Sequence, residues 1–258
     1  MKKPHVIIFS GYGLNTEDET KAAFESVGAT ADIIHLNDVI ERSSILQKAE
    51  VIVFGGGFSY GDHTGAGKAY GNRVRHHLGK AIEEFLARDT LMLGICNGFQ
   101  IITSAGILPG ALVANDIPRY NARWVDLQIQ NDSPWLKGIK TLLVPIAHGE
   151  GKYYAPPSDM ILLSKVKGIG LKYVKGEMCT HFDLPENPNG SLENIAGVTG
   201  YGGRCLGLMP HPERATHFTQ LPHWTLLRES YIRAGLDLPH EGPGLQLFKN
   251  AVHYFHEN

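Results

Sequence analysis

Two short segments of this sequence place a nucleophilic residue midway between two glycines. They are GFSYG at residues 57–61, centred on Ser59, and GICNG at residues 94–98, centred on Cys96. Each follows a short apolar run of the kind that forms a buried strand. A strand that passes into a helix through such a strained turn lifts the central side chain clear of the sheet. The two segments are therefore competing candidates for a serine or a cysteine nucleophile.

The residues that follow each segment favour Cys96. Residues 99–105 form a helix-length stretch that a glycine ends, whereas four glycines and no helical pattern follow Ser59. At the start of a helix, unpaired amides and the macrodipole favour the thiolate form of a cysteine. A lone cysteine is usually a buried packing residue, and that interpretation stands for Cys179 and Cys205. Cys96 is therefore the predicted nucleophile.

A cysteine nucleophile needs a base, and the thirteen histidines offer too many candidates by type alone. His211 is distinguished because it follows the apolar run 205–209. If that run is a strand parallel to residues 91–95, its end meets Cys96 at the same sheet edge. Glu213 would then lie behind the imidazole and fix its orientation, as in triads of nucleophile, base and carboxylate. An isolated His-x-Glu is otherwise typical of a surface loop, so this prediction depends on Cys96.

Metal and nucleotide sites are less well supported. Metal binding would use histidines and carboxylates, and the candidates are His148, Glu150, His211, Glu213 and His217. Neither an HExxH motif nor paired cysteines occur, so we expect no metal site. Residues 62–69 resemble a phosphate-binding loop, but Asp62 replaces its first glycine and Ala69 replaces the required Ser or Thr. We therefore expect no nucleotide site in that loop.

The first part of the chain alternates between predicted strands and helices. Strands are predicted at residues 6–9, 31–36, 51–54 and 91–95. Helices are predicted at residues 74–88, weakly at 39–48, and from a capping box formed by Thr16 and Glu19 toward Gly28. Apolar strands that alternate with helices favour a parallel sheet covered on both faces.

The remaining segments suggest antiparallel additions to this sheet. Short strands are predicted at residues 124–129, 142–146, 160–166 and 171–174, and helices at residues 224–233 and 245–256. No repeat or linker is evident. The expected fold is therefore α/β, a three-layer sandwich with a mostly parallel mixed central sheet, formed by residues 1–258 as a single domain.

Composition excludes several classes of protein. The 258 residues are 43% hydrophobic, which argues against a disordered or fibrous chain. Lys and Arg number 24 against 26 Asp and Glu, so the formal charge of −2 gives no basic field for nucleic acid or anionic membranes. Three cysteines argue against a disulfide scaffold. No signal peptide or membrane span is predicted, and we expect a cytoplasmic protein.

Five motifs, taken together, carry a family resemblance. They are GGFSYGD (residues 56–62), GICNGFQ (94–100), PIAHGEG (145–151), NPNGS (187–191) and MPHPER (209–214). They resemble the class I glutamine amidotransferases, and more narrowly the glutaminase subunits of phosphoribosylformylglycinamidine synthases. The resemblance implies the fold of that class, with a flavodoxin-like core.

The resemblance also implies roles for individual residues. It makes Cys96 the nucleophile, His211 its base and Glu213 the orienting carboxylate. The backbone amides of Gly57 and Asn97 would form the oxyanion hole. The implied substrate-binding residues are Gly56, Phe58, Gln100, Asn187, Asn189, Gly190 and Ser191. Arg119 and Arg123 also stand where the subfamily tends to carry arginines, without an assigned role.

The implied reaction hydrolyses L-glutamine through a cysteinyl thioester and delivers ammonia to a larger, ATP-dependent synthetase subunit. That partner would convert formylglycinamide ribonucleotide to formylglycinamidine ribonucleotide, with a small bridging subunit in the complex. This chain would hold no cofactor, and ATP and Mg would belong to the partner. Two alternatives remain open: a serine hydrolase that uses Ser59, and a non-catalytic regulatory module of the same fold.

Overall fold

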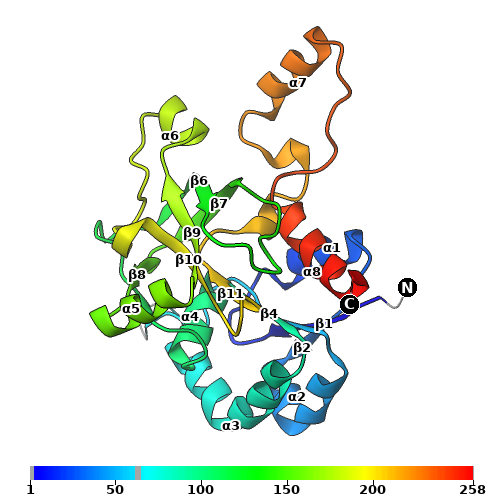
Figure 1. Ribbon diagram of the computed structural model, residues 1–258, viewed down its shortest axis with the longest axis vertical. Helices are drawn as coiled ribbons and strands as arrows, with labels where there is room; N and C mark the ends of the chain where they lie inside the picture. The colour runs from blue at the N-terminus through cyan, green and yellow to red at the C-terminus, as the bar shows by residue number, and fades with distance from the viewer. Residues whose placement is uncertain (1–2, 62–64, 258) are drawn as a thin grey trace.

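A nine-stranded mixed sheet forms the centre of the protein (Figure 1). The computed structural model describes residues 3–61 and 65–257. The strands lie in the order β2 (Thr30–His35), β1 (His5–Ser10), β3 (Val51–Phe54), β4 (Leu91–Ile95), β11 (Cys205–Leu208), β10 (Ile195–Gly200), β9 (Ile169–Val174), β6 (Asn121–Ile129) and β7 (Thr141–His148). The first five are parallel, and the pairings from β10 onward are antiparallel. The predicted antiparallel additions to a parallel sheet are therefore confirmed.

Helices cover both faces of the parallel part of the sheet (Figure 1). On one face α1 (Glu17–Ser26) packs on α8 (Leu245–Glu257), where the rings of Phe24 and Phe248 lie 5.0 Å apart. On the other face α3 (Lys68–Ala87) packs on α4 (Asn97–Ser104). Every residue of β3 and β4 is buried, as expected for strands covered on both sides. The predicted three-layer α/β sandwich is confirmed.

The other elements are short or lie at the periphery. A two-stranded sheet joins β5 (Ala111–Val113) to β8 (Lys152–Tyr154). The predicted weak helix at residues 39–48 becomes α2 (Leu36–Glu41) and a 3-10 helix (Ser43–Lys48). Short 3-10 helices also occur at Leu192–Asn194, Pro212–Arg214 and Phe218–Gln220. The helices α6 (Glu177–His181) and α7 (Trp224–Arg233) project from the body of the protein (Figure 1).

Three local predictions were wrong. Residues 160–166 are not a strand: they lie largely in α5 (Pro157–Lys165), which begins at a proline and buries only Leu163. Helix α3 begins at Lys68 rather than at residue 74. It includes Gly71 because a Cβ there would lie 2.7 Å from the Cβ of Ser104 on α4, so glycine permits the two helices to approach.

The third wrong prediction concerns the capping box at the start of α1. The Thr16 side chain makes no capping hydrogen bond. Its hydroxyl instead accepts a hydrogen bond from the backbone N–H of Gly56, at 2.7 Å. A residue that looked like a local helix signal therefore supports a loop forty positions away.

No helix in residues 3–61 and 65–257 is both long enough and apolar enough to cross a membrane.

Candidate functional site

Cys96 occupies the turn between β4 and α4. Its backbone has φ 51° and ψ −106°, in a region that residues other than glycine rarely adopt. The Cys96 N–H donates to the carbonyl of Leu208 at 2.8 Å, which ties the turn to β11. A strained residue between a buried strand and a helix start is the geometry of a nucleophile elbow. The predicted setting of Cys96 is confirmed.

The two glycines of GICNG permit this turn to pack tightly. A Cβ on Gly98 would lie 1.8 Å from the carbonyl oxygen of Phe54 on β3. A Cβ on Gly94 would lie 2.9 Å from the backbone of Gly98. No side chain larger than hydrogen fits at either position without moving the backbone. The glycines therefore fix the start of α4, and with it Cys96, against the sheet.

His211 reaches the same edge of the sheet as Cys96. Strand β11 runs parallel to β4, with Leu208 beside Ile95. The backbone N–H of His211 donates to the carbonyl of Pro145 at 2.8 Å, which holds the residue just beyond the strand end. The expectation that these two strands are parallel and end together is confirmed.

The imidazole of His211 is paired on one side with a carboxylate. Its Nδ1 lies 2.6 Å from Oε1 of Glu213, and both side chains are almost completely buried. Burial would by itself lower the pKa of His211, but the negative charge of Glu213 and the nearby Cys96 side chain together raise that pKa. Because Glu213 engages Nδ1, Nε2 is the ring nitrogen left for the Cys96 sulfur. The structure thus brings together the three residues predicted to form a triad.

The glycine-rich loop after β3 lies against the same site. Gly57 has φ +147°, and a Cβ there would lie 2.4 Å from the carbonyl oxygen of Gly13. Its neighbours are engaged: the Gly56 N–H by Thr16 and the Phe58 N–H by the Gly13 carbonyl at 2.8 Å. Asn97 is the first residue of α4, so its N–H has no acceptor within the helix. Gly57 lines the same cavity as Cys96, and Asn97 follows Cys96 directly in the chain, so their role as an oxyanion hole stays a prediction.

A narrow cavity opens beside the Cys96 thiol. Its volume is about 10 Å³, on the scale of one water molecule. The Cys96 Sγ lies 3.8 Å from the carbonyl oxygen of Ala147. Above the cavity, Oε2 of Glu150 accepts a hydrogen bond from the Ala66 N–H at 3.0 Å. The lining residues are Gly57, Phe58, Ala66, Cys96, Gln100, Ala147, His148, Gly149 and Glu150.

A family model, the CobB/CobQ-like glutamine amidotransferase domain, matches residues 3–255. The chain belongs to this glutamine amidotransferase family. The match includes both strand ends that carry the cysteine and the histidine.

Several proteins similar to this amidotransferase are known by sequence or structure. It is 41% identical to the phosphoribosylformylglycinamidine synthase subunit PurQ of Methanococcus maripaludis, with 98% of each chain covered. It is 36% identical to the subunit of the same name from Dehalococcoides mccartyi, again with 98% of each chain covered. The solved structure of PurLQS from Thermotoga maritima matches with a TM-score of 0.74 and 29% identity, covering 98% of this chain and 100% of that one.

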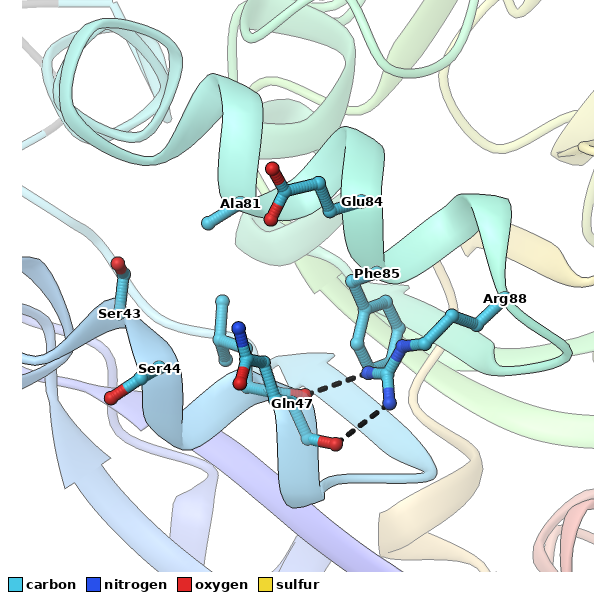
Figure 2. A pocket seen from close by; sticks show the side chains of 8 residues that line it. Ser43, Ser44, Gln47, Ala81, Glu84, Phe85 and Arg88 are labelled. Carbon is cyan, nitrogen blue, oxygen red and sulfur yellow. Dashed lines mark hydrogen bonds between the residues drawn. The ribbon is translucent and has the colours of Figure 1, made fainter.

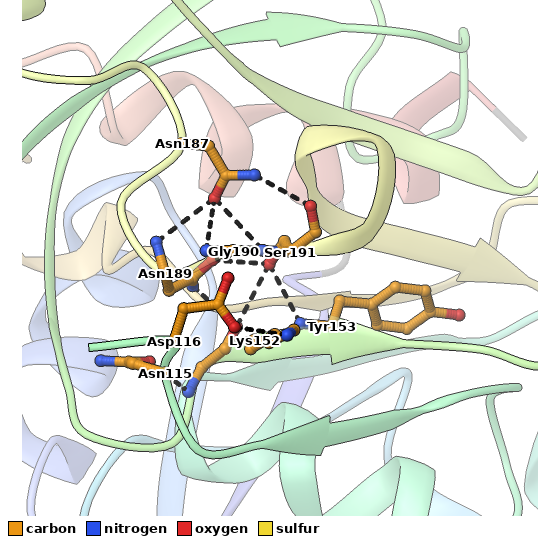
Figure 3. A network of polar contacts seen from close by, with 9 residues as sticks. Asn115, Asp116, Lys152, Tyr153, Asn187, Asn189, Gly190 and Ser191 are labelled. Carbon is orange, nitrogen blue, oxygen red and sulfur yellow. Dashed lines mark hydrogen bonds and ion pairs between the residues drawn. The ribbon is translucent and has the colours of Figure 1, made fainter. Parts of the chain in front are cut away.

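The NPNGS loop of the amidotransferase is held by an internal polar network (Figure 3). The side-chain oxygen of Asn187 accepts from the backbone N–H groups of Asn189, Gly190 and Ser191, at 3.2, 2.8 and 3.2 Å. The Asn189 side chain donates to the carbonyl of Gly151 at 2.8 Å. None of these four loop residues lines the cavity beside Cys96. Their contacts with substrate stay predictions, and their visible role is to hold the loop.

Gln100 and Ser59 both bond to the Asn97 side chain next to Cys96, but only Gln100 lines the cavity. Gln100 lines the cavity, accepts from the Asn97 side chain at 2.7 Å and donates to the carbonyl of Glu150. The Asn97 side chain also accepts from the Ser59 N–H, at 3.1 Å. Ser59 is buried, and the first helix after it among the described residues begins at Lys68. A nucleophile elbow at Ser59 is therefore not supported.

The other two cysteines have no comparable setting. Cys205 is completely buried in β11, and burial raises the pKa of its thiol. Cys179 is buried in α6, where burial and the Asp126 carboxylate raise its pKa. Both thiols are thus held in the neutral form that packs well and reacts poorly. This outcome agrees with the packing role expected from their sequence context.

A second cavity lies near the amino ends of β3 and β4, and Figure 2 shows the side chains that line it. It has a volume of about 420 Å³ between the 3-10 helix Ser43–Lys48 and α3. The guanidinium of Arg88, which lines this cavity, donates hydrogen bonds to the carbonyls of Gln47 and Leu46, at 2.7 and 2.8 Å. These bonds join two elements, and the cavity lies beside the amino end of β4, away from Cys96 at its carboxyl end. Ligands of open α/β sheets bind at the carboxyl ends, so this cavity is the weaker candidate.

Arg119 and Arg123 both take part in hydrogen bonds with other parts of this chain. Arg123 donates to the carbonyl of Pro185, ahead of the NPNGS loop, and burial lowers its pKa. The carbonyl of Arg119 accepts a hydrogen bond from the Asn115 side chain at 3.1 Å.

Among residues 3–61 and 65–257, no group of three or more His, Cys, Asp or Glu residues is placed to hold a metal ion. The phosphate-loop comparison falls partly on residues 62–64, outside the described residues.

Sequence analysis missed the part that β7 plays. The sequence assigns His148 and Glu150 no individual role beyond that of metal-ligand candidates, yet both line the cavity with the thiol. The available signal was the position of the PIAHGEG motif, which sets polar residues directly after an alternating strand. That pattern indicates a strand end at a site, although it does not say which neighbours the side chains meet.

Proposed function

We propose that this amidotransferase is the glutaminase subunit of a phosphoribosylformylglycinamidine synthase. The observation that carries the proposal is the His211–Glu213 pair placed behind a cysteine in a strained strand-to-helix turn. Relatives 36–42% identical over nearly the whole chain bear that subunit name. The substrate is L-glutamine, and the product that matters to the complex is ammonia.

In the first half of the reaction, the Cys96 thiolate attacks the carboxamide carbon of glutamine. The carbonyl oxygen becomes an oxyanion, which the backbone N–H groups of Gly57 and Asn97 stabilise. Loss of one such donor typically costs about 100- to 1,000-fold in rate. His211 protonates the nitrogen, the carbon–nitrogen bond breaks, and ammonia leaves a γ-glutamyl thioester on Cys96.

In the second half, His211 works as a base. Its Nε2 removes a proton from water, and the resulting hydroxide attacks the thioester carbon to release glutamate and the Cys96 thiolate. Glu213 keeps the ring in one orientation and stabilises its positive charge through Nδ1. General acid–base transfer of this kind usually contributes about 100- to 10,000-fold.

The ammonia is delivered to a larger synthetase subunit, because ammonia released into neutral water becomes ammonium and loses its nucleophilicity. The name of the PurLQS structure indicates a multi-subunit assembly for that similar protein. In our proposal the synthetase holds ATP and Mg and converts formylglycinamide ribonucleotide to the amidine, with a small bridging subunit in the complex. We place the complex in the cytoplasm, where ATP is supplied.

A glutamine-like diazo ketone tests the nucleophile and the substrate together. We expect 6-diazo-5-oxo-L-norleucine to add one adduct, located on Cys96 by peptide mass spectrometry, and to abolish glutamine-dependent synthesis by the complex. A fluorophosphonate probe should not label Ser59. Labelling of Ser59, or full glutaminase activity in Cys96→Ala, would contradict the proposal.

A further inference from the structure

His148, the last residue of β7, is a buried histidine that the mechanism above does not use. Its side chain is 2% exposed, and neither Nδ1 nor Nε2 has a hydrogen-bond partner among the described residues. A buried imidazole without partners costs folding free energy, and native proteins retain such groups mainly where function needs them. The residue therefore needs an explanation.

His148 belongs to the wall of the cavity that glutamine must enter to reach the Cys96 thiol. It lines the cavity that holds the Cys96 thiol, and the residue before it, Ala147, places its carbonyl oxygen 3.8 Å from the sulfur. Besides burial, the positive charge of His211 also lowers the pKa of His148. Two histidines, one at the end of β7 and one three residues beyond the end of β11, thus lie in the region of the thiol.

The surrounding backbone is shaped to accept this ring. A Cβ on Gly151 would lie 2.3 Å from the ring atoms of His148, so only glycine leaves room for it. Gly151 is fixed from both sides: its N–H donates to the Asn115 side chain at 3.0 Å, and its carbonyl accepts from Asn189. Asn115 and Asn189, both members of the network in Figure 3, therefore hold Gly151 in place beside the His148 ring.

The two imidazoles differ in charge. Burial, with a smaller contribution from the positive charge of His211, lowers the pKa of His148 to about 4, so its ring is neutral at physiological pH. A neutral imidazole keeps one nitrogen as a hydrogen-bond acceptor. The protonated His211 has no acceptor nitrogen, so in this part of the site only His148 offers an imidazole acceptor.

We propose that His148 accepts a hydrogen bond from the carboxamide N–H of bound glutamine and keeps this contact with the ammonia that forms. The proposal rests on the glutaminase function proposed above. The leaving nitrogen must lie against His211 to receive its proton, and an amide nitrogen has a second hydrogen that needs an acceptor. A weakly basic acceptor orients that nitrogen without protonating the ammonia, which must stay neutral to react in the synthetase.

The test compares two substrates in two variants of similar side-chain size. His148→Leu has no acceptor, and His148→Gln keeps one on a carboxamide oxygen. Each is assembled with the synthetase and assayed with L-glutamine and with L-glutamate γ-methyl ester, whose leaving group has no N–H. We expect His148→Leu to lower kcat/KM for glutamine by about 10- to 100-fold, the usual effect of one lost buried hydrogen bond. Ester hydrolysis should stay unchanged, and His148→Gln should recover part of the amide activity.

Two controls separate this role from a structural one. His148→Leu removes an unpartnered polar group, so its Tm should equal or exceed that of the natural protein. Synthesis driven by added ammonia should be unchanged, since it bypasses glutamine. In His148→Leu, equal losses with amide and ester, or no loss with glutamine, would overturn the proposal. If the unmodified protein shows neither glutaminase activity nor labelling by the diazo ketone, the result contradicts the proposed function instead.

Discussion

The backbone N–H of Cys96 donates to the carbonyl oxygen of Leu208 at 2.8 Å, which joins the cysteine turn directly to the strand that ends three residues before His211. The thiol and the imidazole come from segments more than a hundred residues apart. Their relative position is nevertheless set by the pairing of two parallel strands, which this hydrogen bond extends beyond Ile95. A change that shifts β11 against β4 should therefore reduce catalysis even when both side chains are intact.

The strain at Cys96 predicts a stability difference between two inactive variants. Cys96→Ala and Cys96→Gly both remove the thiol and should abolish glutaminase activity. Glycine adopts a positive φ without steric conflict, so Cys96→Gly should unfold with a free energy about 1 kcal/mol higher than Cys96→Ala. Urea denaturation measures this difference. A less stable glycine variant would show that the turn is not strained.

The carboxylate of Glu213 should set the alkaline limit of activity. Glu213 raises the pKa of His211, and activity is lost as pH rises through that pKa because His211 no longer carries the proton for the leaving nitrogen. Glu213→Gln removes the charge, so the His211 pKa falls and the alkaline limb of the kcat profile moves to lower pH. The rate at the optimum should fall by about 10⁴-fold, as for comparable triads. An unshifted alkaline limb would contradict this coupling.

Two glycine substitutions should have opposite effects on stability, because Gly98 is tightly packed under the cysteine turn and Gly79 is not packed against other residues. Gly98→Ala would drive its Cβ to 1.8 Å from the Phe54 carbonyl, and we expect a loss of about 3 kcal/mol or more, or failure to fold. Gly79→Ala in α3 meets nothing within 4 Å and should raise stability by about 0.5–1 kcal/mol through helix propensity. Thermal unfolding of the pair provides the comparison.

Buried His148 should make the protein less stable in acid. Its pKa is about 4 in the folded state, below the ordinary value of about 6.5 in the unfolded chain. The unfolded chain therefore binds a proton first, and stability falls as pH drops from about 6.5 toward 4, by up to about 3 kcal/mol. His148→Leu should flatten this part of the stability curve. The raised pKa of His211 instead makes the protein lose stability as pH rises on the alkaline side. Because the natural protein and His148→Leu both keep His211, the difference between their stability curves isolates His148.

The sequence predicted those parts of the site that follow apolar strands. Cys96 and His211 each stand after a buried run, and parallel strands bring such ends together. Thr16 was misjudged because its hydroxyl bonds Gly56, a partner that local spacing cannot reveal. Residues 160–166 were misjudged because a short apolar run suits a strand or a helix equally well. His148 was missed because an unpartnered nitrogen becomes visible only once the surrounding atoms are placed.

The tightness of the space beside Cys96 also bears on how the protein survives oxidants. A gap of about 10 Å³ admits little more than a single water molecule, and Cys96 is only 5% exposed, so molecules larger than water reach the sulfur only when the cavity wall moves. Glutamine can drive that movement with the contacts it gains, whereas a small oxidant gains almost none. The resting protein thus shields its thiol, and the vulnerable moment comes after substrate has opened the way.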